Sequence, residues 1–252
     1  MRLQGKAVLI TGGGSGLGRE MALTFAREGA KVGINDVKPE SAQNVLAEVK
    51  AAGANAVMLV ADVSKSSAVK KMFAEFVAAF GTIDVLVNNA GIGRASRFPD
   101  VGGTADLTDE DWHQMLATHI DSTFYCTREA LKVMIPRRSG KIINLGSIAG
   151  TTGLAGASDY CAAKGAIISF SKSVAKEVVQ HGILVNCIAP GFIQTPMTAP
   201  IPEDVRNQIL AATPIGRFGE PRDIALAALY LASDDANFMV GQVVSPNGGY
   251  VI

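Results

Sequence analysis

The feature that most constrains how this chain can fold is a glycine-rich loop between an apolar run and an amphipathic segment near the N-terminus. The run Ala7 to Ile10 leads into the loop Thr11 to Gly18, and apolar residues then recur with helical spacing over Arg19 to Arg27. Glycines let a backbone turn tightly and approach a pyrophosphate, and a following helix presents free amides and its positive dipole end. A glycine cluster alone is also typical of a mobile turn, but the order strand, loop, helix favours a dinucleotide site.

The rest of the chain alternates short apolar runs with longer helical patterns. The further apolar runs, many of them β-branched, are 32–34, 57–60, 85–87, 142–145, 184–188 and 243–244. Alanine-rich segments with helical spacing lie at 20–28, 41–52, 66–80, 112–134 and 159–180. Continuous apolar runs indicate strands buried on both faces, and their alternation with helices indicates parallel pairing. We therefore predict a single Rossmann-like, doubly wound α/β domain over 1–252, with a seven-stranded parallel sheet flanked by helices.

Composition and charge exclude several classes of partner. Lys plus Arg (23) equal Asp plus Glu (23), and no block of like charges occurs, so neither nucleic acid nor a membrane surface is an expected partner. No apolar stretch approaches the roughly 18 residues of a membrane span, and no cleavable signal segment is apparent. The cysteines Cys126, Cys161 and Cys187 lack disulfide or zinc-ligand spacing. We expect a cytoplasmic protein that binds a small molecule and no metal.

Asp36 ends the second predicted strand, where an acidic side chain can accept hydrogen bonds from the ribose hydroxyls of adenosine. The same carboxylate would repel the 2′-phosphate of NADP, and neither Ser15 nor Val37 supplies a compensating cation. An ordinary turn residue at a strand end is the alternative. We predict that the cofactor is NAD.

A second constellation has the residue types of an acid/base site. Tyr160 and Lys164 are spaced as i and i+4 in a predicted helix, which puts them on one face. A nearby ammonium favours the phenolate of a tyrosine, whose pKa is otherwise about 10, and so makes it a usable general acid/base. Ser147 follows the strand that ends at Leu145, at the sheet edge where α/β folds bind ligands. Singly these residues have commoner explanations, but together they predict proton transfer to a substrate oxygen.

Taken in order over the full length, the motifs resemble those of the short-chain dehydrogenase/reductase family. The matching residues are Thr11-Gly12-x-x-x-Gly16-x-Gly18, Asp36, Asp62-Val63, Asn88-Asn89-Ala90-Gly91, Ser147, Tyr160-x-x-x-Lys164, Pro190-Gly191 with Thr195, and Gly241-Gln242 with Gly248-Gly249. The resemblance implies hydride transfer between a nicotinamide and a secondary alcohol or ketone. In that reaction Tyr160 would transfer the proton and Ser147 would orient the substrate oxygen, so that charge is neutralised as it develops.

The resemblance also implies which residues hold the cofactor. The expected set is Gly12, Gly14, Ser15, Gly16, Leu17, Gly18, Asp36, Asp62, Val63, Asn88, Ala90, Gly91, Tyr160, Lys164, Pro190, Gly191, Ile193 and Thr195. Within this set, Asp62 and Val63 would lie next to the adenine. Ile193 and Thr195 would lie near the nicotinamide carboxamide, and Lys164 would bind the nicotinamide ribose.

One position departs from the family's pattern, because His119-Ile120 stands where an asparagine and a hydrophobic residue are usual. In the family this asparagine helps to hold a water that extends a proton path from the lysine, partly through its backbone carbonyl, which any side chain preserves. A histidine, with an ordinary pKa near 6.5, can also take up the proton itself. Two interpretations stay open: His119 is a fourth catalytic residue in a proton relay, or it fills space while the backbone carries the relay.

Two long loops are expected to shape the substrate end of the site. The segment 190–219, with a predicted helix at 203–212, lies where relatives carry a substrate-covering lid. The segment 94–107 is longer than expected for the acyl-carrier-protein reductases that this chain otherwise resembles, and it would reshape the entrance. Loop residues that suggest an apolar pocket are Phe98, Phe192, Met197 and Ile201.

The function that these motifs favour is an NAD(H)-dependent oxidoreductase that interconverts a secondary alcohol and a ketone, with Tyr160 as general acid/base. A 3-oxoacyl-acyl-carrier-protein reductase is the alternative, disfavoured by Asp36 because that step usually draws on NADPH. A non-catalytic NAD-sensing protein is a remote third hypothesis. The resemblance further implies a homotetramer, with which the apolar ending Tyr250-Val251-Ile252 is compatible.

Overall fold

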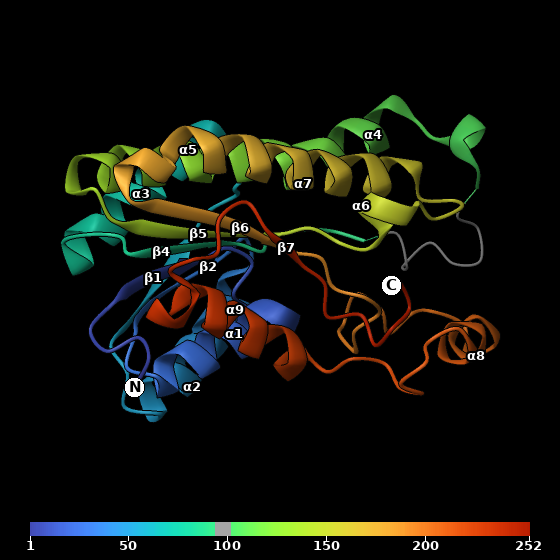
Figure 1. The fold of residues 1–252 in the computed structure, drawn as a ribbon, viewed down its shortest axis with the longest axis horizontal. Coiled ribbons are helices and arrows are strands. Elements are labelled where there is room, and N and C mark those ends of the chain that lie inside the picture. Colours follow the sequence, from blue (N-terminus) through green and yellow to red (C-terminus); the bar gives the residue numbers. More distant parts are fainter. Residues whose placement is uncertain (94–101) are drawn as a thin grey trace.

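The apolar runs identified in the sequence are the strands of one parallel sheet (Figure 1). The strands are β1 (Ala7–Ile10), β2 (Lys31–Asp36), β3 (Ala56–Val60), β4 (Val85–Asn88), β5 (Gly140–Leu145), β6 (Ile183–Ile188) and β7 (Val243–Val244). They lie in the order β3-β2-β1-β4-β5-β6-β7, and Val8 of β1 is paired with both Val32 and Val85. The order reverses between β1 and β4, which is the switch point of a doubly wound fold. The predicted Rossmann-like architecture is confirmed.

The structure is a computed structural model that describes residues 1–93 and 102–252. Its α-helices are α1 (Gly16–Arg27), α2 (Pro39–Ala51), α3 (Ser66–Phe80), α4 (Asp109–Leu116), α5 (Ser122–Arg137), α6 (Ala149–Thr152), α7 (Ser158–Val178), α8 (Glu203–Ala211) and α9 (Pro221–Ala232). Short 3₁₀ turns occur at Thr104–Asp106, Val179–His181 and Asp234–Ala236. Phe98 and the first part of the predicted 94–107 segment lie outside the described residues.

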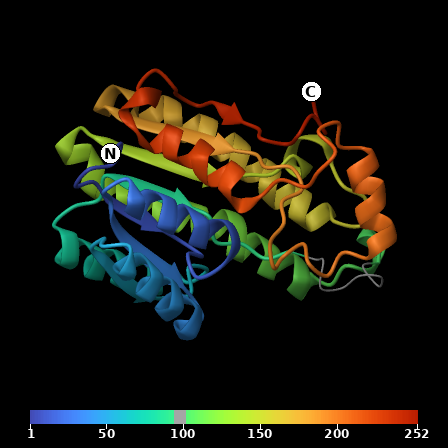
Figure 2. The same cartoon turned by 90° about the horizontal axis from the view of Figure 1, so that it is seen from below.

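Helices cover both faces of the sheet. Figure 1 and Figure 2 show α1, α2 and α9 on one face and α3, α5 and α7 on the other. The residues of β1 alternate between the two layers, since Val8 and Ile10 pack on the first and Ala7 and Leu9 on the second. All of these β1 side chains are buried. Burial on both faces explains why the strand is an uninterrupted apolar run in the sequence.

The segment predicted as one helix, 112–134, instead consists of two helices joined by a π-helical turn, Ala117–Asp121. Side-chain hydroxyls bond to the backbone carbonyls of this turn: Ser122 Oγ donates to Thr118 at 2.6 Å and Thr123 Oγ1 to His119 at 2.8 Å. Such bonds compete with the regular helical ladder. A π turn inserts one residue locally, and hydrophobic periodicity is too coarse to reveal it.

Two helices are absent from the sequence-based prediction. The helix α6 lies between Ser147 and Tyr160, where no helix was predicted. The helix α9 begins at Pro221, and Asp223 accepts a hydrogen bond from the backbone N–H of Glu220 at 2.8 Å. A proline in the first turn and an acidic side chain bonded to the preceding amide are helix-start signals that the sequence does contain.

The long segment after β6 carries α8 beyond the carboxyl ends of the strands (Figure 2). The helix predicted at 203–212 is therefore present. It packs through Ile209 against Ile201 and Phe218 in a small apolar cluster separate from the cores that flank the sheet. Over the described ranges 1–93 and 102–252, none of the helices is both long enough and apolar enough to cross a membrane.

Candidate active site

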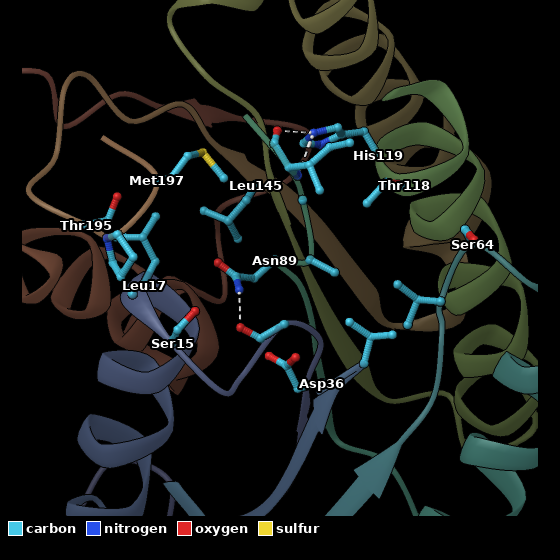
Figure 3. A pocket seen from close by; sticks show the side chains of 18 of the residues that line it. Ser15, Leu17, Asp36, Ser64, Asn89, Thr118, His119, Leu145, Thr195 and Met197 are labelled. Atoms are coloured by element: carbon cyan, nitrogen blue, oxygen red, sulfur yellow. Dashed lines mark hydrogen bonds between the residues drawn. The ribbon is translucent and has the colours of Figure 1, made fainter. Parts of the chain in front are cut away.

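A cavity of about 980 Å³ lies at the carboxyl ends of β1 to β6, where the connecting loops converge (Figure 3). The predicted site residues that line it are Gly12, Ser15, Gly16, Leu17, Asp36, Asp62, Val63, Ala90, Gly91, His119, Ser147, Tyr160, Lys164, Pro190, Gly191, Ile193 and Thr195. Gly14, Gly18 and Asn88 belong to the predicted set but do not line the cavity. Tertiary folding therefore gathers nearly all the motifs around one space.

The glycine loop is packed too tightly for side chains. A β-carbon on Gly12, whose φ is +61°, would lie 2.8 Å from the α-carbon of Ala90, and one on Gly18 would overlap the carbonyl oxygen of Gly12. Asn89, which lies just after the neighbouring strand β4, holds the loop in place. Its Nδ2 donates to the carbonyl oxygens of Thr11 at 2.9 Å and Gly12 at 3.0 Å. The helix α1 begins within the loop, at Gly16, and Ser15, Gly16 and Leu17 at its N-terminus line the cavity, so the loop fits a pyrophosphate.

Asp36 is held at the other side of this loop by backbone amides (Figure 3). Its Oδ2 accepts from the N–H of Gly14 at 3.0 Å, and its Oδ1 accepts from the N–H of Lys38 at 3.0 Å. A β-carbon on Gly14 would lie 2.6 Å from that Oδ2, which explains why Gly14 is needed although it does not line the cavity. The anchored carboxylate lines the cavity beside the loop, as a ribose-binding residue must.

Tyr160 lies in the first turn of α7, and Ser147 lies just after the end of β5. Both residues line the cavity. Burial raises the pKa of Tyr160 above its ordinary value, whereas a hydrogen bond with the Ser147 side chain opposes the shift. The sequence-based expectation that the neighbouring ammonium lowers this pKa is therefore not met. Desolvation of the phenolate outweighs every favourable interaction, so Tyr160 is a protonated phenol at neutral pH.

Lys164 lies one turn further along α7 and is only 5% exposed. Its Nζ donates a hydrogen bond to the carbonyl oxygen of Leu145 at 2.7 Å and lies 5.7 Å from the centroid of the Tyr160 ring. Burial lowers the pKa of Lys164 to about 8. The charge therefore stands beside the phenol at neutral pH, held by the end of β5.

His119 is fully buried at the centre of the π-helical turn, with an exposed fraction of 0%. Its Nε2 lies 2.9 Å from the carbonyl oxygen and 3.2 Å from the amide nitrogen of Ile92, as the dashed lines of Figure 3 show. Its ring stands at 86° to the ring of Tyr160, with centroids 5.5 Å apart. Burial, together with the nearby charge of Lys164, lowers the pKa of His119 to about 3. The imidazole is therefore neutral over the pH range of most enzymes.

Asn88 lies beneath the cavity, where it joins strands to helices. Its Nδ2 donates to Asn144 Oδ1 at 2.8 Å and to Thr127 Oγ1 at 3.1 Å, and Asn144 Nδ2 donates to Ser171 Oγ at 2.8 Å. This buried chain of hydrogen bonds ties β4 and β5 to α5 and α7. The side-chain amide of Asn88 thus supports the site from beneath, and the cofactor contact of Asn88 stays a prediction.

Several cavity residues carry no motif and were missed by sequence reasoning. They include Lys38, Ser64, Lys65, His113, Gln114 and Thr118, whereas Met197, which also lines the cavity, was already expected in the substrate pocket. Their positions just after strands or on α4 depend on how distant segments meet. For Lys38 and Lys65 alone a signal exists, since each closely follows a predicted adenosine-binding aspartate.

Comparisons with known proteins agree with this arrangement. A family model described as enoyl-(acyl carrier protein) reductase matches residues 12–251. The 3-oxoacyl-acyl-carrier-protein reductase of Thermotoga maritima is 38% identical over 252 residues, covering 100% of both chains. The Escherichia coli protein of the same name is 39% identical over 249 residues, covering 99% of this chain and 98% of that protein.

Solved structures give the same result at the level of the fold. The crystal structure of a levodione reductase superposes with a TM-score of 0.93 at 33% sequence identity, covering 98% of each chain. The family match, the relatives and the superposition each cover nearly the whole chain. This chain therefore belongs to the short-chain dehydrogenase/reductase family and is an oxidoreductase.

Proposed function

We propose that this protein is an NAD(H)-dependent enzyme that interconverts a ketone and a secondary alcohol, with residues 1–252 forming one catalytic domain. The observation that carries the proposal is the convergence of Ser147, Tyr160 and Lys164 in the cavity that also contains the glycine loop and Asp36. Acid/base groups and a dinucleotide cradle in one cavity are what hydride transfer to a carbonyl requires.

The chain's own residues supply the proton chemistry of this reaction. A bound nicotinamide supplies or accepts the hydride. In the direction of reduction, the phenol of Tyr160 gives its proton to the substrate oxygen as the carbonyl π pair moves onto that oxygen. The hydroxyl of Ser147 donates a hydrogen bond to the same oxygen, and the charge of Lys164 stabilises the phenolate that is left. Uptake of a proton from solvent restores Tyr160, so the ketone gains one hydride and one proton.

The raised pKa of Tyr160 suits this direction of reaction. A phenol that is fully protonated at neutral pH is ready to act as an acid. In the direction of oxidation, the phenolate of Tyr160 must accept the proton of the alcohol. This reaction is therefore favoured by alkaline pH. Ketone reduction at neutral pH and alcohol oxidation at higher pH are the expected activities.

Asp36 supports NAD in preference to NADP. Its carboxylate is fixed by two backbone amides beside the glycine loop. A carboxylate that meets the ribose there would accept hydrogen bonds from a 2′-hydroxyl and repel a 2′-phosphate. Lys38 and Lys65 also line the cavity, and their charges would offset part of this repulsion. The cofactor proposed is therefore NAD.

The substrate class is the point on which the relatives differ. The relatives named as 3-oxoacyl-acyl-carrier-protein reductases favour a 3-oxoacyl thioester, whereas the levodione reductase favours a cyclic ketone. We propose a small uncharged ketone as the substrate, because Asp36 argues against the NADPH-dependent step of fatty-acid synthesis. The 3-oxoacyl thioester is the second candidate, and the segment 190–219 would cover either substrate as a lid.

One set of rates tests the reaction and the substrate class together. Purified protein is assayed with NADH and NADPH against a cyclic diketone, a steroid ketone and acetoacetyl coenzyme A, with nicotinamide absorbance as the signal. Turnover of cyclic ketones with NADH supports the proposal. Turnover of the thioester alone, with NADPH, would establish the second candidate.

The variant Tyr160→Phe separates an enzyme from a non-catalytic NAD sensor. The enzyme proposal expects turnover to fall by at least about a hundredfold, as for loss of a general acid, while NADH binding stays within about twofold. The matched control is Tyr230→Phe, because Tyr230 lies on α9 away from the cavity. A wild-type protein that binds NADH tightly and reduces no ketone of the panel would instead support the sensor.

We further propose that the protein is a cytoplasmic homotetramer. A groove of about 600 Å³ lies between α5 and α7, and its apolar lining includes Phe124, Leu131, Ile135, Phe170 and Val174. Phe124 is 42% exposed despite its size. An apolar face along two parallel helices is suited to burial against the same face of a second copy across a two-fold axis.

A further inference from the structure

The strongest feature that the proposed reaction leaves unexplained is the buried imidazole of His119. It is the single histidine among the buried residues of the described chain, and it contacts the ring of the proposed acid Tyr160. Its Nδ1 is buried and has no hydrogen-bond partner among the described residues. A buried ring that touches the catalytic tyrosine and leaves one nitrogen unpartnered calls for a role of its own.

Both backbone polar groups of Ile92 lie within hydrogen-bond distance of Nε2. The carbonyl oxygen, at 2.9 Å, accepts from Nε2 in the tautomer that carries the hydrogen on Nε2, whereas the amide N–H, at 3.2 Å, donates to Nε2 in the other tautomer. In either tautomer the ring is a neutral imidazole that is bonded through Nε2 to the backbone of Ile92.

The hydrogen bond between His119 and Ile92 fixes the segment 91–93, which also contacts the proposed lid, residues 190–219. Ile92 is flanked by Gly91, against which the His119 ring lies, and by Gly93, against which Met197 of the lid packs. A β-carbon on Gly93 would lie 2.7 Å from Cγ of Met197, so contact there is close. His119 therefore connects the ring of Tyr160 on one side with the wall that the lid touches on the other.

We propose that His119 is a positioning residue that stays uncharged during turnover: it fixes the backbone of Ile92 and holds the ring of Tyr160 edge to face. The inference rests on the ketone-reducing function proposed above. It assigns His119 no proton transfer. The proton path through the backbone carbonyl of His119, which the family resemblance implies, is also restricted. That oxygen already accepts hydrogen bonds from Thr123 Oγ1 at 2.8 Å and Ser122 Oγ at 3.0 Å.

Three substitutions separate positioning from proton relay. His119→Gln places an amide N–H near the position of Nε2 and keeps the bond to Ile92, but glutamine neither titrates nor shuttles protons as an imidazole does. His119→Phe keeps a ring beside Tyr160 and loses the bond. His119→Asn is shorter and places its amide near the position of Nδ1.

If His119 positions Ile92, His119→Gln retains kcat/KM for the ketone within about threefold, and the phenylalanine and asparagine variants lose about tenfold or more, as for one buried hydrogen bond. The loss should include a raised KM for the ketone, while NADH affinity and the acid limb of the pH profile stay unchanged. A relay role predicts instead that His119→Gln is as impaired as His119→Phe and that the acid limb moves. That result would overturn the proposal.

A spectroscopic measurement tests the same idea without turnover. Histidine ring signals of the ¹⁵N-labelled whole protein, assigned with His113→Asn and His181→Asn, should show one neutral ring that does not titrate between pH 5.5 and 8.5. A His119 signal that titrates near its ordinary pKa of about 6.5 would contradict the inference. Because no substrate is needed, this outcome is distinct from failure of the proposed reaction.

Discussion

The imidazole of His119 lies against the backbone of Gly91 so closely that a β-carbon on Gly91 would be 3.0 Å from Nδ1 and would overlap Cε1. Both residues line the cavity, and the ring of His119 has no exposed surface through which to move aside. The shape of the site at this point is therefore decided jointly by a glycine that the motif predicts and a histidine that departs from the motif.

We predict that Gly91→Ala lowers the free energy of unfolding by about 1–3 kcal/mol, the usual cost of overpacking. In the background of His119→Ala the same substitution should cost much less, because the ring no longer occupies the space. Urea unfolding of the two single variants and the double variant measures the coupling. Additive effects would show that ring and glycine are independent. Gly103→Ala is the control, since the nearest atom to its β-carbon is 3.8 Å away.

Asp36 should control the choice of cofactor. Replacing it by serine removes the charge that faces a 2′-phosphate, and Lys38 and Lys65 then remain as cations that line the cavity. We expect the ratio of kcat/KM for NADPH to that for NADH to rise about tenfold to a hundredfold, equivalent to roughly 1.4–2.8 kcal/mol. Adding Lys38→Ala to Asp36→Ser should remove part of the gain. An unchanged ratio in Asp36→Ser would disprove the assignment of Asp36 to the ribose.

The buried ammonium of Lys164 should lower the free energy of unfolding of this protein at neutral pH. Burial lowers its pKa to about 8 in the folded protein, whereas lysine titrates near 10.4 when unfolded. Between these two values the unfolded chain binds more protons, so the free energy of unfolding rises with pH across this window. Below it, the folded protein bears the full cost of a buried charge.

Lys164→Met should therefore raise the Tm of the cofactor-free protein at pH 7 by roughly 5 °C, corresponding to about 2 kcal/mol after loss of the bond to Leu145. The gain should shrink as the pH approaches 10, and turnover should be lost throughout. Thermal unfolding at pH 7 and pH 9.5 measures the difference. The control is Lys172→Met, an exposed lysine of the same helix, for which we expect no pH-dependent gain. Equal gains at both pH values would contradict the assigned cause.

The groove between α5 and α7 should be a subunit interface. Phe124→Lys places a charge in this apolar face next to Arg128, whose guanidinium lies 5.1 Å from the Phe124 ring centroid. Repulsion and lost apolar contact should weaken the assembly at least about tenfold, as for other interface anchors. Sedimentation velocity would show smaller species. Val60→Lys, at the outermost strand, should leave the assembly intact. A wild-type protein that sediments as a monomer would end this proposal.

The sequence by itself was sufficient for the fold class and for about half of the residues that line the cavity. Strands buried on both faces are continuous apolar runs such as Ala7 to Ile10, and a helix N-terminus after glycines has a recognisable order of residues. The spacing of Tyr160 and Lys164 places both on one helical face whatever the rest of the chain does. Local periodicity and short-range geometry determine such features, so they are readable without coordinates.

Only the tertiary structure decided the electrostatics of the site and the surroundings of His119. Whether the pKa of Tyr160 falls beside Lys164 or rises through burial depends on how much protein encloses the phenol, and burial prevails. The π-helical turn that buries His119, and the approach of its ring to Gly91 and Ile92, arise where segments distant in sequence pack together. Desolvation and close packing are properties of the assembled interior, and no local pattern of residues encodes them.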